Sequence, residues 1–152
     1  MTQQLTTPAE DAVSGEVYQE VLHFYAQHMQ LLDAGAAADW AATFVEDCLV
    51  DLPNLTPVHG RAALATTMAA AAAQLQTDGV QRRHWHGMVA VRPMADGELD
   101  VRCYALIFQT PFGGQPRLHR TCVCHDVLVR ERGGLLVRSR RVTRDDLNTA
   151  LS

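Results

Sequence analysis

The residue pattern of the chain changes from helical to β-rich near Gly79, and this single change restricts the folds that the chain can adopt. Before Gly79, the first long segment has apolar residues every three or four positions, and the last is rich in alanine, patterns that favour helices. After Gly79, four long β-rich segments follow one another, separated by short turns that contain glycine. Strands joined by such short turns are antiparallel neighbours. Helices followed by a meander predict an α+β fold with the helices on one face of the sheet.

The predicted elements follow from this division. We expect helices at 16–34, 40–44 and 61–75, and strands at 48–52, 83–92, 99–109, 117–130 and 135–143. Ser14 suits the N-cap of the first helix, Gly35 its end, and Asp39 the cap of the second. A long sheet that curves over helices leaves a hollow between the layers. The prediction is therefore a cone-shaped α+β barrel, with three N-terminal helices packed on a curved antiparallel sheet and an internal pocket.

The length and composition indicate one ordinary globular domain. The 152 residues suit a single domain at 16–152, and residues 1–15 read as a flexible polar tail. That tail has no basic start and no apolar core, so it does not resemble a signal peptide. The longest apolar run, Met68–Ala73, is far too short to span a membrane. We therefore expect a cytoplasmic protein.

Charge and cysteine content exclude other classes of partner. The net charge of −4 argues against a nucleic-acid-binding protein, which would carry a basic face. The four cysteines should be reduced in the cytoplasm, and no pair has the CxxC spacing that is typical of a metal site.

Three polar residues are candidates for chemistry, namely Asp33, His84 and His119. Asp33 lies one turn after Met29 on the apolar side of the first helix, where a carboxylate is costly unless it is paired. His84 and His119 open the first and third strands of the meander. An aspartate beside a histidine fixes its tautomer, and a second histidine can then supply a proton. This set is sufficient to eliminate water or to close a ring.

Simpler interpretations and a metal site remain open for these residues. A histidine in a strand is often an ordinary core or surface residue, and Asp33 can be a solvated helix-end residue. His86 shares a strand face with His84, and His125 shares one with His119, by the period of two. Four histidines on facing strands can bind a metal. No carboxylate or cysteine with fitting spacing supports such a site, so we expect none.

Several short motifs together resemble a known family. They are LLDAG with ADW, then FVEDCLVDL, HGRAAL, RRHWHG and DVLVRERGGLLVRSRRV, and they extend from Tyr18 to Thr143. Their order and spacing resemble the SnoaL-like group of the nuclear transport factor two superfamily. That superfamily includes scytalone dehydratase, aromatic polyketide cyclases, ketosteroid isomerase and the small subunits of ring-hydroxylating dioxygenases.

The resemblance to scytalone dehydratase assigns candidate catalytic residues. Asp33 matches the dehydratase aspartate if residues 36–38 are an insertion, and His84 matches the histidine of its HxxG stretch. His119 matches the second histidine within a one-residue slip. Two tyrosines of the dehydratase are replaced here by Leu32 and Leu52, which argues against the same substrate.

The function that the resemblance implies is a cofactor-independent acid–base enzyme of secondary metabolism, for example in antibiotic biosynthesis. It would act as a dehydratase or cyclase, including ring closure by epoxide opening, on an aromatic or polyketide-type intermediate. His84, held by Asp33, would be the base, and His119 would be the partner acid or would polarise a carbonyl. The residues expected to bind the substrate are Tyr25, Trp40, Trp85, His86, Tyr104 and Phe108.

Two alternatives belong to other classes of protein. The chain can be a non-catalytic small (beta) subunit of a ring-hydroxylating dioxygenase, or a small-molecule-binding module. The strand pattern from Val127 to Arg141 alternates apolar residues with arginine on the outer face of the sheet, which favours a subunit contact. We therefore also predict a homodimer through the sheet.

Overall fold

The structure is a computed structural model that describes residues 12–148, so most of the predicted tail lies outside the described residues. Helix α1 (Gly15–Asp33) begins at Ser14, whose hydroxyl oxygen accepts a hydrogen bond of 3.2 Å from the Val17 N–H, as predicted. Gly35 then adopts a φ of +73°, which lets the chain turn into α2. Helix α2 (Ala37–Ala41) is short, and α3 (Arg61–Asp78) ends at Gly79 in the left-handed conformation.

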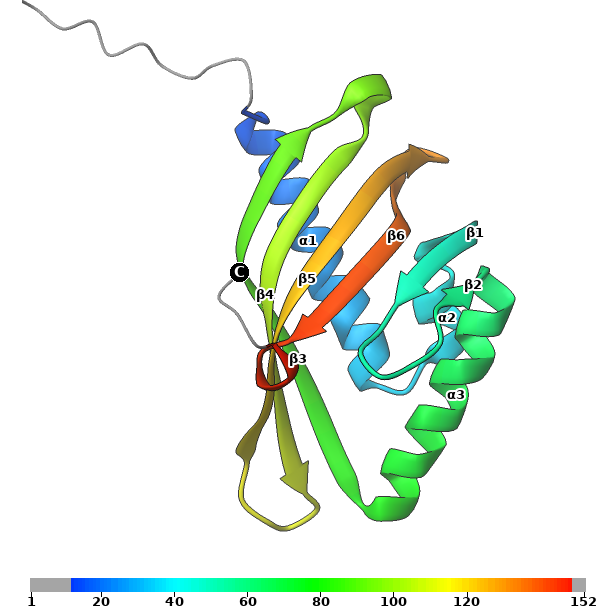
Figure 1. The fold of residues 1–152 in the computed structure, drawn as a ribbon, viewed down its shortest axis with the longest axis vertical. Coiled ribbons are helices and arrows are strands. Elements are labelled where there is room, and N and C mark those ends of the chain that lie inside the picture. The colour runs from blue at the N-terminus through cyan, green and yellow to red at the C-terminus, as the bar shows by residue number, and fades with distance from the viewer. Residues whose placement is uncertain (1–11, 149–152) are drawn as a thin grey trace, which may run out of the picture.

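The six strands form one sheet in the order β2-β1-β6-β5-β4-β3 (Figure 1). The strands are β1 (Phe44–Asp51), β2 (Val58–His59), β3 (Val80–Pro93), β4 (Leu99–Pro111), β5 (Arg117–Glu131) and β6 (Gly134–Arg144). Two short 3₁₀ turns, η1 (Ala95–Gly97) and η2 (Asp145–Leu147), follow β3 and β6. The four long strands are the predicted meander, extended by a few residues at most ends.

The sheet is mixed: the four strands of the meander are antiparallel, as predicted, and β1, outside the meander, adds one parallel pair. Strand β1 lies parallel to β6, with Val50 opposite Arg140, while every other pair is antiparallel among the described residues. The reason is that no hairpin joins β1 to β6. Helix α3 separates β1 from β3 in the chain, so the direction of β1 is not fixed by a short turn to its neighbour.

The second helix also begins earlier than predicted. It starts at Ala37 rather than Trp40, and Phe44 already opens β1. Asp39 therefore lies inside the first turn instead of capping the helix, a place where the helix dipole also favours a negative charge. Trp40 is within both the predicted and the observed helix, and its side chain is buried in the core.

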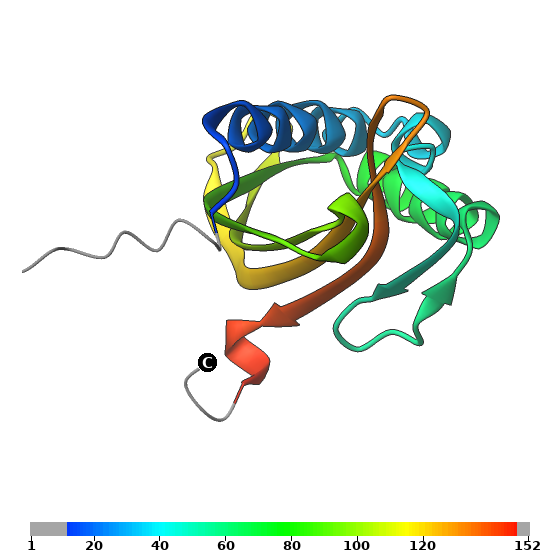
Figure 2. The same cartoon turned by 90° about the horizontal axis from the view of Figure 1, so that it is seen from above.

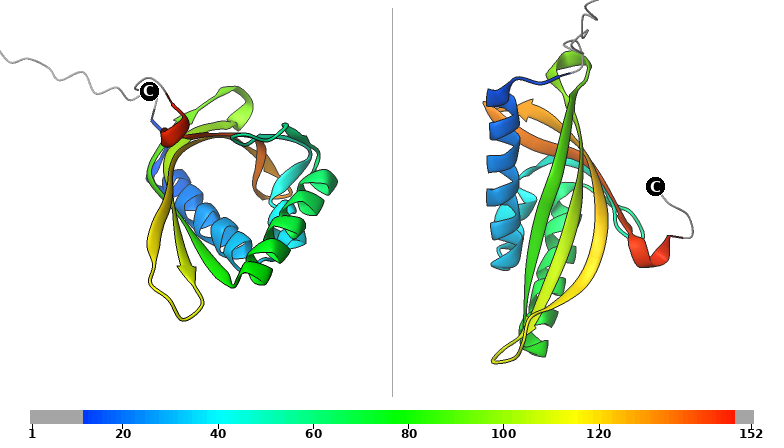
Figure 3. Two further views of the ribbon diagram at one scale, coloured as in Figure 1. Left: turned by 60° about the horizontal axis from the view of Figure 1, so that its bottom comes forward. Right: turned by 90° about the vertical axis from the view of Figure 1, so that its left-hand side faces the viewer.

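The long strands curve around one side of the molecule, and α1 and α3 lie on the concave side (Figures 2 and 3). Side chains therefore alternate between an inner and an outer face along each strand. On β4, Val101, Cys103 and Ala105 point inward and are buried, whereas Tyr104 is exposed. None of the helices within residues 12–148 has the length and apolar character needed to cross a bilayer.

Candidate active site

The C-terminal end of α1 meets the first half of β3, and this contact brings Asp33 and His84 together. The Asp33 Oδ1 atom lies 2.6 Å from His84 Nδ1, and Asp33 Oδ2 accepts the backbone N–H of His84 at 3.1 Å. Because a carboxylate only accepts hydrogen bonds, Nδ1 carries a proton, and in the neutral imidazole the lone pair is therefore on Nε2. The two bonds from one carboxylate fix both the tautomer and the position of the imidazole.

Asp33 occupies a place where a carboxylate has no structural advantage. It is the last residue of α1, where the partial negative charge of the helix end disfavours an acidic side chain by roughly 0.3 to 1 kcal/mol. Only 7% of its side chain is exposed, against 19% for His84. The Gln81 side chain donates to the Asp33 carbonyl oxygen at 2.9 Å and satisfies this end of the helix. This costly but fully bonded carboxylate is typical of a residue that orients a functional group.

His84 lies between two adjoining cavities of about 200 Å³ each. Leu32, Met68 and His84 line both of them. The first extends along α3 and contains Asp33, Arg82 and the alanine face of the helix. The second lies between α1, β1 and the inner face of β4, β5 and β6, and most of its exposed lining is apolar. A small aromatic molecule in this space would touch the imidazole of His84.

His119 lies at a β-bulge beside the site, where it contacts a cavity residue but lines neither cavity. Ile107 pairs with Arg120 and Phe108 pairs with Leu118, so His119 is the extra residue of β5. Its Nε2 atom lies 3.3 Å from a terminal nitrogen of Arg82, a residue that lines the first cavity. Because arginine only donates, this nitrogen of His119 is the acceptor. Burial, and then the charges of Arg120 and Arg82, lower the pKa of His119.

The bulge also separates His119 from His125. Contrary to the prediction, the two histidines therefore lie on different faces of the sheet. Residues 120, 122, 124 and 126 of β5 point inward, and His125 points outward. His125 is half-exposed, and its Nε2 lies 3.2 Å from Asp100 Oδ1 on the outer face. A cluster of four histidines is therefore not formed, because His125 faces away from the cavity.

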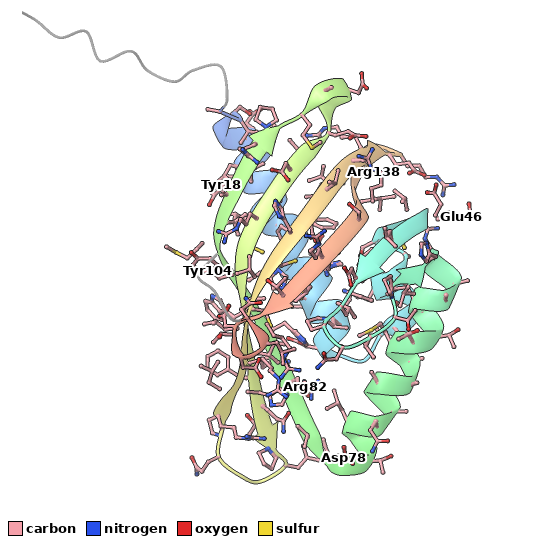
Figure 4. The ribbon with its side chains drawn as sticks, viewed as in Figure 1. Tyr18, Glu46, Asp78, Arg82, Tyr104 and Arg138 are labelled. Atoms are coloured by element: carbon pink, nitrogen blue, oxygen red, sulfur yellow. The ribbon has the colours of Figure 1, made fainter. Side chains whose placement is uncertain are left out.

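The sequence did not lead us to expect arginine side chains in the cavities, but four arginines line them. Arg82 lines the first cavity, where it faces α3 (Figure 4), and Arg120, Arg140 and Arg144 line the second. The alternation of β5 and β6 carried the signal, since residues 120, 140 and 144 fall on the inner face once the strands are aligned. The sequence interpretation placed the arginines of the Val127–Arg141 pattern on the outer face from their spacing, whereas Arg140 lies on the inner face.

Arg140 lines the second cavity and forms a buried ion pair with Asp126. Its Nε and one terminal nitrogen donate to the two oxygens of Asp126 at 2.8 and 2.7 Å, and both side chains are buried. The Tyr25 hydroxyl donates to the same carboxylate at 2.7 Å, and so does the Cys124 thiol at 3.3 Å. Burial alone would raise the pKa of Asp126, but the charge and hydrogen bonds of Arg140 lower it overall. Tyr25, predicted to bind substrate, is thus part of this buried network.

His86 lies on the same face of β3 as His84, beside a cysteine pair. Cys103 and Cys124 are directly opposite each other on β4 and β5, and the Cys103 sulfur lies 3.5 Å from His86 Nδ1. Donor atoms of these three residues all lie within 4.8 Å of one another. Hydrogen bonds from Cys124 and His86 lower the pKa of Cys103. Cross-strand pairing forms this group, so a search for CxxC spacing could not find it.

Three of the predicted substrate-binding aromatics lie outside the cavity, and this part of the prediction is wrong. Trp85, Tyr104 and Phe108 are 68%, 47% and 36% exposed, and they lie on the outer face of β3 and β4. Figure 4 shows Tyr104 projecting away from the helices. The period of two explains this, since the inner positions are those of His84, Ala105 and Ile107. Trp40, by contrast, lines the second cavity.

Comparisons with known proteins identify the fold family. The sequence model of the SnoaL-like domain matches residues 14–141. The structure of Aln2 from a Streptomyces species is 38% identical, with 89% of this chain and 95% of that chain covered and a TM-score of 0.83. ActVI-ORFA from Streptomyces coelicolor is 36% identical, with 87% and 99% covered and a TM-score of 0.81.

A third solved structure contains a bound molecule. It is a protein from Catenulispora acidiphila in complex with S-DNPA, 31% identical, with 88% of this chain and 96% of that chain covered and a TM-score of 0.77. A comparison with curated proteins finds no match. The order of helices and strands, the curved sheet with its inner cavity and these matches over most of the chain agree with one another. The chain therefore belongs to the SnoaL-like domain family.

Proposed function

We propose that the protein is an acid–base enzyme that dehydrates or cyclises an aromatic, polyketide-type intermediate. The observation that carries the proposal is the Asp33–His84 pair, which presents an oriented imidazole to the cavity. The apolar lining of the second cavity suits an aromatic ring, and the relative that holds S-DNPA supports a small-molecule ligand.

His84 is the catalytic base in this proposal, and Asp33 is a positioning residue. Nε2 of His84 removes a proton, either from the carbon beside a substrate carbonyl or from a hydroxyl that attacks to close a ring. Asp33 stabilises the imidazolium that forms, because its Oδ1 already accepts the Nδ1 proton. In a dehydration, the same proton then leaves with the departing hydroxide as water. No oxidant or further reactant is needed for either reaction.

His119 is the second group, and its surroundings favour the role of polarising a carbonyl. Burial and the charges of Arg120 and Arg82 lower its pKa, which favours the neutral imidazole over a proton donor. Since Nε2 accepts from Arg82, Nδ1 keeps its hydrogen and can donate it to a carbonyl oxygen. A neutral imidazole backed by a guanidinium can stabilise the negative charge that develops on that oxygen.

Purified protein tested alone on aromatic β-hydroxy ketones checks this function. We expect loss of water or ring closure, followed by mass spectrometry and ultraviolet absorption, and a strong decrease in the His84→Ala variant. General-base catalysis typically contributes about 10²- to 10⁴-fold. His125→Ala, a histidine on the outer face, is the matched control and should keep its turnover. Equal turnover in the two variants would contradict the proposal.

The alternative of a non-catalytic small subunit has one observation in its favour. The outer face exposes Trp85, Tyr104 and Leu118, which suits packing against another subunit. A second copy of this chain can occupy the same face, so the exposure alone does not separate the two functions. Turnover by the purified protein does separate them, because a subunit without catalytic groups has none.

A further inference from the structure

Two arginines of the cavity have no carboxylate partner, in contrast to their neighbours. Arg140 pairs with Asp126, and Arg144 pairs with Asp146. Arg82 and Arg120 make no ion pair with any carboxylate of residues 12–148. Arg82 donates to the side-chain oxygen of Gln109 at 3.2 Å and to His119, and Arg120 donates to the backbone oxygen of His119 at 3.0 Å.

These two guanidinium groups are close to each other and half-buried. Both contact His119, one at its ring and the other at its backbone. Burial, and then the charge of Arg120, lower the pKa of Arg82, as expected for like charges that share a site. Half-buried cations that repel each other are costly, and a bound anion would remove that cost.

The cationic pair also lies beside the proposed base. Arg82 lines the cavity that contains Asp33 and His84, and Arg120 lines the cavity on the other side of His84. Because both cavities contain His84, a molecule that contacts its imidazole has one of the two arginines in the lining of its own cavity, and one that extends past the imidazole can meet both. Each arginine extends from a position of the inner face of its strand, where apolar residues are more usual.

We propose that Arg82 and Arg120 form a subsite for a carboxylate carried by the substrate. This inference rests on the proposed function and specifies its substrate as a free aromatic acid. A planar guanidinium matches a carboxylate with two parallel hydrogen bonds, and this match fixes orientation as well as charge. An ester or thioester of the same acid has no charge and leaves the arginines unpaired. The reaction that supplies the substrate must therefore release a free acid, as hydrolysis of a thioester by water does.

Calorimetric binding of 2-naphthoate and of its neutral methyl ester tests the subsite without any turnover. We expect wild-type protein to bind the acid at least about tenfold more tightly than the ester, and added salt to reduce this difference. Arg82→Gln and Arg120→Gln should each weaken the preference, and the double variant should abolish it. Arg83→Gln, the exposed neighbour on the outer face of β3, is the matched control and should retain the preference.

The outcome for the subsite is distinct from the outcome for catalysis. Equal affinities of wild-type protein for acid and ester overturn the subsite, whether or not the variants fold. His84→Ala should still prefer the acid, because it removes the base and leaves the arginines in place. An acid preference in a protein without turnover would thus refute the proposed function and keep the subsite.

Discussion

His28 shows how a single buried side chain makes the stability of this protein depend on pH. The ring is fully buried among Phe24, Tyr25, Trp40 and Phe44. Its Nδ1 lies 2.6 Å from the Thr43 hydroxyl oxygen, whose own proton goes to a backbone carbonyl, so Nδ1 donates. Nε2 has no hydrogen-bond partner among the described residues. Burial, and then the charge of Arg140, lower the pKa of His28 well below its ordinary value.

We predict that this histidine destabilises the protein in mild acid. Its pKa in the unfolded chain is near 6.5, and its folded pKa is lower, so the unfolded chain binds the extra proton first. The contribution to stability is complete above about pH 6.5 and is lost as the pH falls below that value. Urea unfolding at several pH values should show a shallower acid decline in His28→Phe than in wild-type protein. Parallel declines would contradict this account.

The buried pair of Arg140 and Asp126 should be costly to break from one side. Arg140→Leu leaves the Asp126 carboxylate buried without its charge partner, and we expect the free energy of unfolding to decrease by about 3 to 5 kcal/mol. Arg130→Gln, which breaks the exposed pair with Glu20, is the control and should have a small effect. Chemical denaturation of the two variants provides the comparison. A similar small effect for both would show that Asp126 is not held charged by Arg140.

Among the elements, α1, which carries Asp33 at its C-terminal end, is stabilised by the Ser14 cap at its N-terminal end. Ser14→Ala removes the cap of α1 and should lower the free energy of unfolding by about 1 kcal/mol, while Ser14→Asp should preserve it. Turnover should change little, because Asp33 lies at the opposite end of the helix. A large loss of turnover in Ser14→Ala, measured well below its melting temperature, would mean that α1 positions Asp33 less rigidly than its contacts indicate.

The elements also show what the sequence can and cannot predict. Helical periodicity located α1 and glycine turns located the meander, while the assignment of Asp33 and His84 as a pair, which lie in contact in the structure, came from the family resemblance. The parallel pairing of β1 was not predictable, since no short connection joins it to β6. The bulge at His119 was equally hidden, because one extra residue leaves the strand pattern intact while it changes which side chains face inward.

At the scale of the whole molecule, the outer face of the sheet carries several exposed apolar side chains. Trp85, Tyr104, Phe108 and Leu118 are exposed there on β3, β4 and β5, more so than the apolar residues of the predicted Val127–Arg141 region. We propose a homodimer through this face, since large apolar side chains gathered on one surface mark protein contacts.

Light scattering at tens of micromolar should therefore give the mass of a dimer. Trp85→Glu with Tyr104→Glu should give a monomer, because two buried carboxylates oppose the contact. Glu131→Gln, an exposed change at the end of β5, is the control and should leave the dimer intact. A monomeric wild-type protein would contradict the assembly while leaving the cavity and its chemistry unaffected.

The central claim is that Asp33 and His84 act as one catalytic unit, and a double-mutant cycle on turnover tests it most directly. We expect His84→Ala and Asp33→Asn each to lower kcat strongly with little change in KM, and the double variant to be no worse than His84→Ala alone, since residues that act together are not additive. Melting temperatures should remain close to that of wild-type protein. Turnover of His84→Ala within about threefold of wild type, which is under 1 kcal/mol of barrier, would contradict the account. So would independent losses that multiply in the double variant.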